Sequence, residues 1–239
     1  MLFFYIRHGD PIYDPDSLTP LGRRQAESVA KRLALYGIDK IYASTSTRAI
    51  ETARPTCELL KKEMTLLDFA NESHAWRDLA VLQEDGKKKW ACETERFRRL
   101  FVSREVRSLQ TRWYDHPAFA GFPSFREGIE RIDRELDAFF LSLGYEHKRE
   151  EGYFLPVHPT NERIALFAHA GFGGAMLASL LDIPYPYVCS QFDMSHSSLT
   201  VISFFETDGV VIPQVLTFSN DSHLYRDGLP TRHNNRLYF

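Results

Sequence analysis

The first ten residues of the chain constrain its fold most strongly. Residues 1–6, Met-Leu-Phe-Phe-Tyr-Ile, form an apolar run with the length of one buried strand, and the run leads directly into Arg7, His8 and Gly9. These three residues stand where a central strand of an α/β sheet would end, which is the edge at which such sheets bind ligands. Gly9 allows a sharp turn, the neutral ring of His8 can act as a nucleophile, and Arg7 offers a planar set of donors to a phosphoryl group. Taken alone, the tripeptide is equally compatible with a strand end that carries a solvated arginine and a capped histidine.

The first seventy residues alternate between strand and helix patterns. Thr19 and Pro20 are typical of an N-cap and a first helical position, and apolar residues then recur at helical spacing as far as Gly37, a predicted C-cap. A second helix is expected to be kinked or stopped by Pro55. After the first helix, a strand is predicted over 38–43, the second helix over 48–62 and a further strand over 64–69. The β-α-β-α-β order predicts a mostly parallel sheet.

The alternation breaks between about residues 72 and 161, where no strong strand pattern is present. Residues 87–112 are charged and compatible with a helix, and residues 126–143 show a clear apolar stripe at helical spacing. We therefore expect a helical insert over about 72–161 that forms a cap over the carboxyl edge of the sheet.

After the insert the alternation resumes. A helix ends near Leu181, and a turn at Asp208 and Gly209 joins the last two strands, whereas residues 221–239 show no periodicity. The strands of this part are predicted over 163–168, 198–205 and 210–218. Residues 1–239 are thus predicted to be a single α/β domain, a three-layer α-β-α sandwich with a mostly parallel central sheet and a helical cap insert.

Composition and charge exclude several classes of protein. The 239 residues are 44% hydrophobic and 26% charged, and a net charge of −3 gives no electrostatic case for a nucleic-acid partner. The cysteines are odd in number and form no CxxC pair, so neither a zinc site nor a disulfide framework is indicated: Cys57, Cys92 and Cys189. We expect a cytoplasmic protein without a membrane partner, because neither a leader pattern nor an apolar run of membrane-spanning length is present.

A second histidine stands at a second strand end. His169 follows the strand predicted over 163–168, as His8 follows the first strand. If these strands are parallel neighbours, both histidines emerge at one sheet edge, and Arg48, at the start of a predicted helix, opens toward the same edge. Two histidines and two arginines near helix N-termini predict a phosphate pocket. A metal site would need carboxylates or an HxxxH spacing, and neither is present, so no metal or cofactor is predicted.

Four short segments occur in an order that is typical of one known family. They are Arg7–Gly9, Leu18–Gly22 with Gln25-Ala26, Tyr42–Ala53 and Phe167–Gly171. Through these segments the chain resembles the histidine phosphatase superfamily, the phosphoglycerate-mutase-like proteins of branch 1. The resemblance covers about the first sixty residues and the stretch 163–205, and no motif covers the insert or the tail.

The resemblance implies a role for each matching residue. His8 would be the nucleophile that becomes phosphorylated, and Arg7 and Arg48 would hold the phosphoryl oxygens. His169 would donate to the oxygen on which charge develops in the transition state. Substrate contacts would come from four loop positions, Gly9, Asp14, Ala170 and Gly171.

Two implied positions involve carboxylates. Asp14 stands where many members of the family, mutases especially, carry an asparagine that touches the phosphate, and a carboxylate beside a phosphate is unfavourable. A second carboxyl group, between the third strand and the insert, would protonate the leaving oxygen and then activate water. Glu72 is the first candidate for this acid and Asp78 the second, followed by Glu84 or Asp85.

The implied function is metal-independent hydrolysis of a small phosphorylated metabolite through a phosphohistidine. Two alternatives are a phosphoglycerate-mutase-type phosphotransferase, which returns the phosphoryl group to the substrate, and a phospho-ligand-binding protein without turnover. The basic segment 86–112 is either a lid that selects anionic substrates or a solvated helix face. A second copy of the chain, in a homodimer, is a further candidate partner.

The remaining aromatic residues and histidines have no role implied by a motif. Trp76, Trp90 and Trp113 are expected in the core of the insert. His196 and His223 are expected either to be structural or to line the pocket, and residues 222–225 would in the second case close over it.

Overall fold

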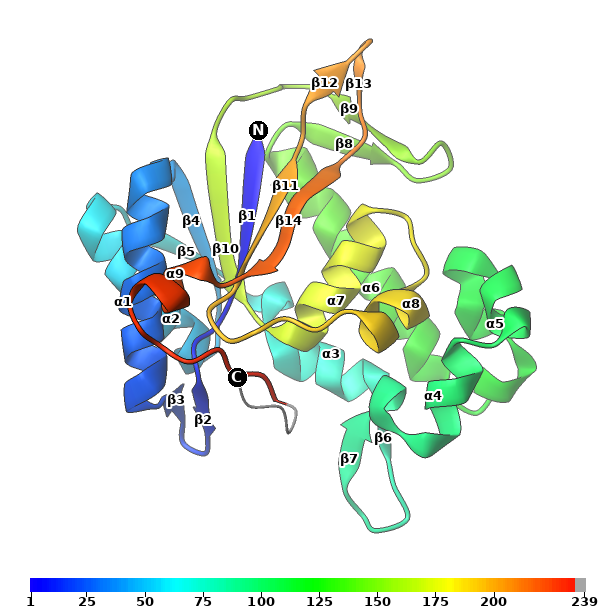
Figure 1. The fold of residues 1–239 in the computed structure, drawn as a ribbon. Coiled ribbons are helices and arrows are strands. Elements are labelled where there is room, and N and C mark those ends of the chain that lie inside the picture. Colours follow the sequence, from blue (N-terminus) through cyan, green and yellow to red (C-terminus); the bar gives the residue numbers. More distant parts are fainter. Residues whose placement is uncertain (235–239) are drawn as a thin grey trace.

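The computed structural model describes residues 1–234 and has a six-stranded central sheet in the order β14-β11-β1-β10-β4-β5 (Figure 1). Four neighbouring strands are parallel: β1 (Leu2–Arg7), β10 (Arg163–Ala168), β4 (Lys40–Ser44) and β5 (Met64–Leu67). The other two strands are antiparallel to their neighbours, β11 (Leu199–Ser203) to β1 and β14 (Gln214–Asn220) to β11. The predicted α/β class with a mostly parallel sheet is confirmed.

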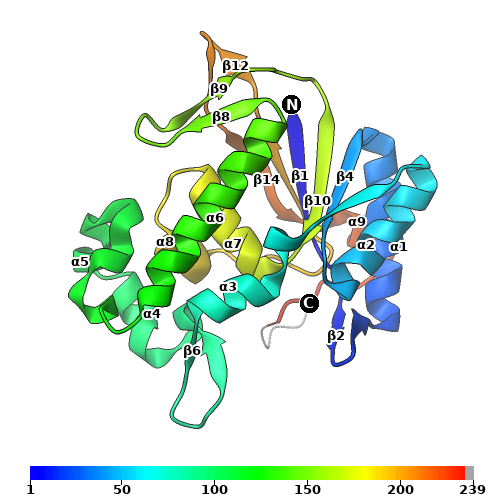
Figure 2. The same ribbon diagram turned by 180° about the vertical axis from the view of Figure 1, so that it is seen from behind.

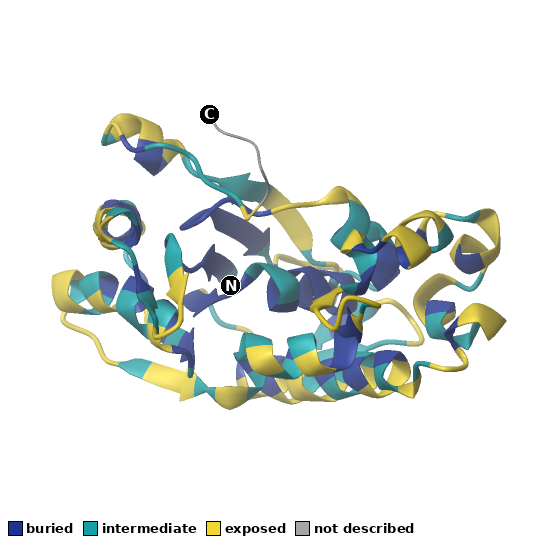
Figure 3. Ribbon diagram, turned by 90° about the horizontal axis from the view of Figure 1, so that it is seen from below, coloured by how far each residue is buried: buried dark blue, intermediate teal, exposed yellow. Residues whose placement is uncertain are grey.

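Helices cover both faces of this sheet, which gives the three predicted layers (Figures 1 and 3). One face carries α1 (Pro20–Tyr36) and α2 (Thr47–Leu60), and the other carries α6 (Pro123–Ser142) and α7 (Ala170–Leu180). Alternate residues of β1 serve the two cores: Phe4 and Ile6 pack on the α1–α2 side, and Phe3 and Tyr5 on the α6–α7 side. A strand that is buried on both faces needs an uninterrupted apolar run, which accounts for the opening residues of the sequence.

The ends of the first two helices follow local sequence signals. The Thr19 hydroxyl accepts a hydrogen bond from the Gly22 amide at 3.0 Å, and Gly37 ends α1 in the left-handed conformation, with φ at 72°. In contrast, α2 continues through Pro55 to Leu60, so the proline does not stop it. Ala53 and Thr56 are both buried, so the helix stays packed on either side of the proline.

The stretch 72–161 differs from the prediction, because it contains four strands. β6 (Ala80–Leu82) and β7 (Lys88–Trp90) form one hairpin. A second small sheet, beyond the amino end of β1, combines β8 (Tyr145–Lys148), β9 (Tyr153–Pro156), β12 (Glu206–Thr207) and β13 (Val210–Val211) (Figure 1). None of the four strands within the stretch exceeds four residues, which is too short for an alternating pattern to be recognised. The insert, which was predicted to be helical, therefore also contains short strands.

The helices of this stretch, apart from α6, are short. They are α3 (Glu72–Leu79), α4 (Glu95–Phe101) and α5 (Arg104–Ser108), with 3-10 turns at Ala91–Glu93, Gln110–Asp115 and Pro117–Phe119. The basic segment is divided because Thr94 and Ser103 act as N-caps of α4 and α5. Figure 2 shows α4 and α5 beside α6, away from the sheet. That the stretch acts as a cap over the site remains a prediction.

The tryptophans of the insert divide into two groups. Trp113 is buried and packs against the rings of Phe101, Phe119 and Phe125, as expected for a core residue. Trp76 and Trp90 pack edge to face with ring centroids 4.9 Å apart and are only partly buried. Trp76 and Trp90 are therefore not core residues of the insert.

The remaining elements include one that the sequence did not predict. The tail contains the short helix α9 (Ser222–Arg226), which packs on α1, where the Ser28 hydroxyl donates to the His223 carbonyl at 2.9 Å. Five residues are too few to give a periodic signal. The other short elements are β2 (Pro11–Tyr13), β3 (Asp16–Leu18), a 3-10 turn at Asp68–Ala70 and α8 (Tyr185–Gln191). Among the described helices, none combines the length and the apolar character needed to cross a membrane.

Candidate active site

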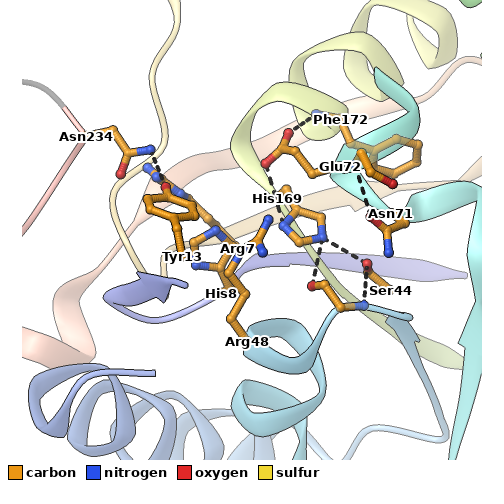
Figure 4. Close-up of polar contacts among 12 residues, drawn as sticks. Arg7, His8, Tyr13, Ser44, Arg48, Asn71, Glu72, His169, Phe172 and Asn234 are labelled. Carbon is orange, nitrogen blue, oxygen red and sulfur yellow. Dashed lines mark hydrogen bonds and ion pairs between the residues drawn. The ribbon is translucent and has the colours of Figure 1, made fainter. Parts of the chain in front are cut away.

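Four of the predicted site residues meet at the carboxyl edge of the parallel strands (Figure 4). Arg7 ends β1 and is paired in register with Ala168, the last residue of β10, so His8 and His169 leave the sheet side by side. Their ring centroids are 5.3 Å apart. Arg48 reaches the same place from the first turn of α2. The topology thus converts two strand ends that are 161 residues apart in the sequence into one site.

The ring of His8 is buried and has one nitrogen bound to the protein. Its Nδ1 lies 2.7 Å from the Gly9 carbonyl oxygen, which can only accept, so Nδ1 carries the proton and Nε2 the lone pair. Nε2 has no hydrogen bond within the described chain. Burial, then the charges of Arg7, His169 and Arg48, hold the pKa of His8 well below its usual value. The ring is therefore neutral at neutral pH.

Two guanidinium groups flank this ring. Arg7 is 1% exposed and donates through Nη1 to the Met194 carbonyl, and Arg48 Nη1 lies 2.7 Å from Asp16 Oδ1. In the described part of the chain, the Nε atoms of both arginines are buried without a hydrogen-bond acceptor. Buried cationic donors that lack an acceptor are costly, and two guanidinium groups beside one histidine attract an oxyanion.

His169 is fixed by two hydroxyl groups on β4 and the loop after it. Its Nε2 lies 2.8 Å from Ser44 Oγ and 3.2 Å from Ser46 Oγ. Because Ser44 Oγ already accepts from the Ser46 amide, its proton is available to His169 Nε2, and we infer that Nδ1 of this neutral ring carries the ring proton. Burial, then Arg48 and Arg7, hold the pKa of His169 well below its usual value.

Glu72, the first residue of α3, lies next to His169. Its Oε2 is 3.5 Å from His169 Nδ1, and its Oε1 accepts from the Phe172 amide at 2.9 Å at the start of α7 (Figure 4). Burial raises the pKa of Glu72, although the Phe172 amide, Arg48 and Arg7 all favour the charged form. A carboxyl group with a raised pKa can hold a proton at mildly acidic pH.

The other acid candidates lie elsewhere. Asp78 is buried between α3 and α6, where it contacts Arg77 at 2.7 Å and Arg131 at 3.2 Å. Glu84 and Asp85 are at the exposed turn of the β6–β7 hairpin. Among the four candidates, only Glu72 is in contact with a site histidine.

Not all of the predicted substrate-contact positions lie at the site. Gly9 and Gly171 are at the site, and neither has room for a Cβ, which would come 2.6 Å from the Gly22 carbonyl oxygen at Gly9 and 2.4 Å from the Trp90 ring at Gly171. Ala170 is the first residue of α7. Asp14 is exposed at the turn of the β2–β3 hairpin, so the structure does not bring it to the other site residues.

Two groups of residues at the site were not recognised from the sequence. Ser46 precedes α2, but its side chain makes no cap hydrogen bond there and contacts His169 instead. Tyr13 and Asn234 form a wall beside Arg48, whose guanidinium lies 5.4 Å from the centre of the Tyr13 ring. The serines were part of a motif, whereas no local signal marks Tyr13 or Asn234.

The same cluster could also accept a cation. His8, Glu72 and His169 each offer a ligand atom, and these atoms lie within 4.8 Å of one another. A two-histidine, one-carboxylate set is chemically suitable for a transition metal. The adjacent guanidinium groups of Arg7 and Arg48 repel a cation and attract an anion, so the electrostatics of the pocket favour a phosphoryl group.

A family comparison identifies this architecture. The model of the histidine phosphatase superfamily (branch 1) matches residues 4–214. The chain belongs to this superfamily. The resemblance inferred from four short segments is thereby confirmed, and the match extends through the insert, which no segment had covered.

Solved structures of two phosphatases share the fold at low sequence identity. Phosphoserine phosphatase from Entamoeba histolytica, in complex with 3-phosphoglyceric acid, is 19% identical with a TM-score of 0.60, over 93% of this chain and 98% of that one. Mycobacterial glucosyl-3-phosphoglycerate phosphatase is 20% identical with a TM-score of 0.58, over 91% and 98%. No curated protein matched the sequence.

The unpaired guanidinium donors lead to a binding prediction. Replacing Arg48 by glutamine should weaken the binding of inorganic phosphate by about 10- to 100-fold, because one charge-assisted hydrogen bond contributes about 1.5–3 kcal/mol. Titration calorimetry measures this, with Arg54→Gln, an exposed position of the same helix, as the matched control. Equal affinity in the Arg48 and Arg54 variants would contradict an anion site at Arg48.

Proposed function

We propose that this chain is a metal-independent phosphatase that hydrolyses a small phosphorylated metabolite through a phosphohistidine at His8. The observation that carries the proposal is the neutral, buried ring of His8 beside two guanidinium groups. Within residues 1–234, His8 Nε2 makes no hydrogen bond and the buried Nε donors of both arginines have no acceptor. Membership of the histidine phosphatase superfamily supports it. The structural relatives that act on phosphoserine and glucosyl-3-phosphoglycerate support a small metabolite as substrate.

In the first step of the proposed reaction, the lone pair of His8 Nε2 attacks phosphorus in line with the leaving oxygen. Arg7 and Arg48 hold the other phosphoryl oxygens and offset their charge, while His169 Nδ1 donates to one of them. The P–O bond to the leaving group breaks, and the Glu72 carboxyl group delivers the proton that the leaving oxygen requires.

In the second step, water replaces the histidine on phosphorus. Glu72, now a carboxylate, takes a proton from the attacking water, the P–N bond to His8 breaks, and inorganic phosphate leaves. Glu72 is thereby protonated again and His8 is neutral, so both groups return to their starting states. The cycle uses only side chains of this chain.

The mutase alternative differs only in which acceptor receives the phosphoryl group. No contact in the described site favours it, and the exposed position of Asp14 removes the one loop residue that would match the asparagine of the mutase pattern. Release of inorganic phosphate without a bisphosphorylated primer distinguishes a phosphatase from a mutase. Turnover of any phosphomonoester distinguishes both from a binding protein.

The nucleophile can be tested by trapping the intermediate. His8→Ala should lose on the order of 10³-fold or more in turnover, because no other side chain that the structure describes at the site can replace Nε2. Acid-labile phosphate, located by mass spectrometry after base quenching, should be on His8 in the unaltered protein. His74→Ala, a partly exposed histidine of α3, is the matched control, and dialysis against EDTA should leave the rate unchanged. Turnover in His8→Ala, or phosphate on another residue, would contradict the mechanism.

The proposed acid can be tested by varying the leaving group. Glu72→Gln keeps an acceptor for the Phe172 amide but cannot deliver a proton. In single turnovers it should lose about 10²–10⁴-fold on an alkyl phosphate and far less on nitrophenyl phosphate, whose leaving group needs no proton. Asp78→Asn is the control and should show equal changes on both substrates. A leaving-group-dependent loss in Asp78→Asn alone would move the acid to Asp78.

A further inference from the structure

A third histidine packs against the ring of His8. His196 is 3% exposed and lies in the loop between α8 and β11. Its ring centroid is 5.8 Å from that of His8, and the two planes are inclined by 29°, which is a stacked arrangement. The neighbouring backbone also contacts His8, since the Ser197 amide donates to the His8 carbonyl at 3.0 Å. The loop thus forms the wall behind the proposed nucleophile.

Both ring nitrogens of His196 lie beside protein oxygens. Nδ1 is 3.2 Å from Asp10 Oδ1, and Asp10 belongs to the loop that begins at His8. Nε2 is 2.8 Å from the side-chain oxygen of Asn234, and the His196 amide donates to the Arg232 carbonyl at 2.8 Å. His196 therefore joins the nucleophile loop to residues 232–234 of the C-terminal segment, and neither nitrogen is directed to a substrate.

The C-terminal segment continues the connection to Arg48. The Asn234 side-chain amide lies 2.8 Å from the Tyr13 hydroxyl, and the Tyr13 ring lies under the Arg48 guanidinium, 5.4 Å from ring centre to carbon (Figure 4). Asp10, His196, Asn234, Tyr13 and Arg48 thus form one chain of contacts. In Figure 4, Tyr13 and Asn234 lie on the side of His8 that is opposite Glu72 and Phe172.

We infer that His196 is a positioning residue of this site, which holds the ring of His8 by stacking and, through Asn234 and Tyr13, sets the position of that ring relative to Arg48, which Asp16 holds independently. The inference rests on the proposed function. A nucleophile must meet phosphorus in line with the leaving oxygen, and a displacement of about 1 Å can reduce the rate about 100-fold. Loss of His196 removes the stacking partner and separates Asp10 from the C-terminal segment in a single change.

The kinetic test separates rate from binding. In His196→Ala, single-turnover phosphorylation by nitrophenyl phosphate should slow about 10- to 100-fold, while the affinity for inorganic phosphate changes less than about 3-fold. His223→Ala, a buried histidine that contacts Ser197 but not His8, is the matched control and should keep the rate. Equal losses of rate and affinity in His196→Ala, or the same loss in His223→Ala, would indicate general damage to the fold and overturn the inference.

A double-mutant cycle tests the coupling. Asn234→Ala should slow phosphorylation less than His196→Ala does, and the double variant should be no slower than His196→Ala, because both changes break one chain of contacts. Tyr13→Phe, which keeps the ring under Arg48 but removes the hydroxyl, should behave like Asn234→Ala. Multiplying losses in the double variant would contradict the coupling.

A measurement without turnover distinguishes failure of this inference from failure of the proposed function. The ring signals of His8 should be sharp in the unaltered protein, because the ring is held in one position, and broadened by exchange between ring positions in His196→Ala, where the stacked ring is lost. Equally sharp His8 ring signals in His196→Ala would overturn the positioning role whether or not the protein is a phosphatase. Absence of phosphohistidine in the unaltered protein would overturn the proposed function alone.

Discussion

The site depends on positive charge that is buried next to a neutral imidazole. Arg7 is almost fully enclosed, and the Nε atoms of Arg7 and Arg48 lack an acceptor in the described chain. The same charges, together with burial, disfavour protonation of His8 and His169, so both rings keep a lone pair at neutral pH. An arrangement that attracts an anion and keeps the nearest nitrogen unprotonated is what nucleophilic attack on a phosphoryl group requires.

The sheet brings these groups together at one edge. Because β1 and β10 are parallel neighbours in exact residue pairing, Arg7, His8 and His169 leave the core at one edge, where the amide groups at the start of α7 are also available. The Phe172 amide donates to Glu72 and lowers the pKa of its carboxyl group, whereas burial raises that pKa and has the larger effect. One sheet edge thus brings a neutral imidazole and a carboxyl group with a raised pKa within 4.8 Å of each other.

The sequence predicted the elements that are marked by local motifs, such as helix caps, or by apolar patterns that extend over many residues. The apolar run before Arg7, the capped helix from Pro20 and the two strand-histidine-glycine segments were sufficient for the fold and for the four residues at the sheet edge. It did not predict the short hairpins of the insert, because three or four residues carry no periodicity. Nor could it place Asp14 away from the site or Asn234 beside Tyr13, because these positions depend on tertiary contacts between distant segments.

The central claim, that the His8 ring nitrogen and the two arginines together receive a phosphoryl group, is tested most directly by a crystal structure with vanadate. Vanadate adopts the five-coordinate geometry of the transition state. The account predicts vanadium bonded to His8 Nε2, with equatorial oxygens on Arg7, Arg48 and His169 and the apical oxygen next to Glu72. Vanadate bound away from His8, or an empty pocket at saturating vanadate, would contradict it.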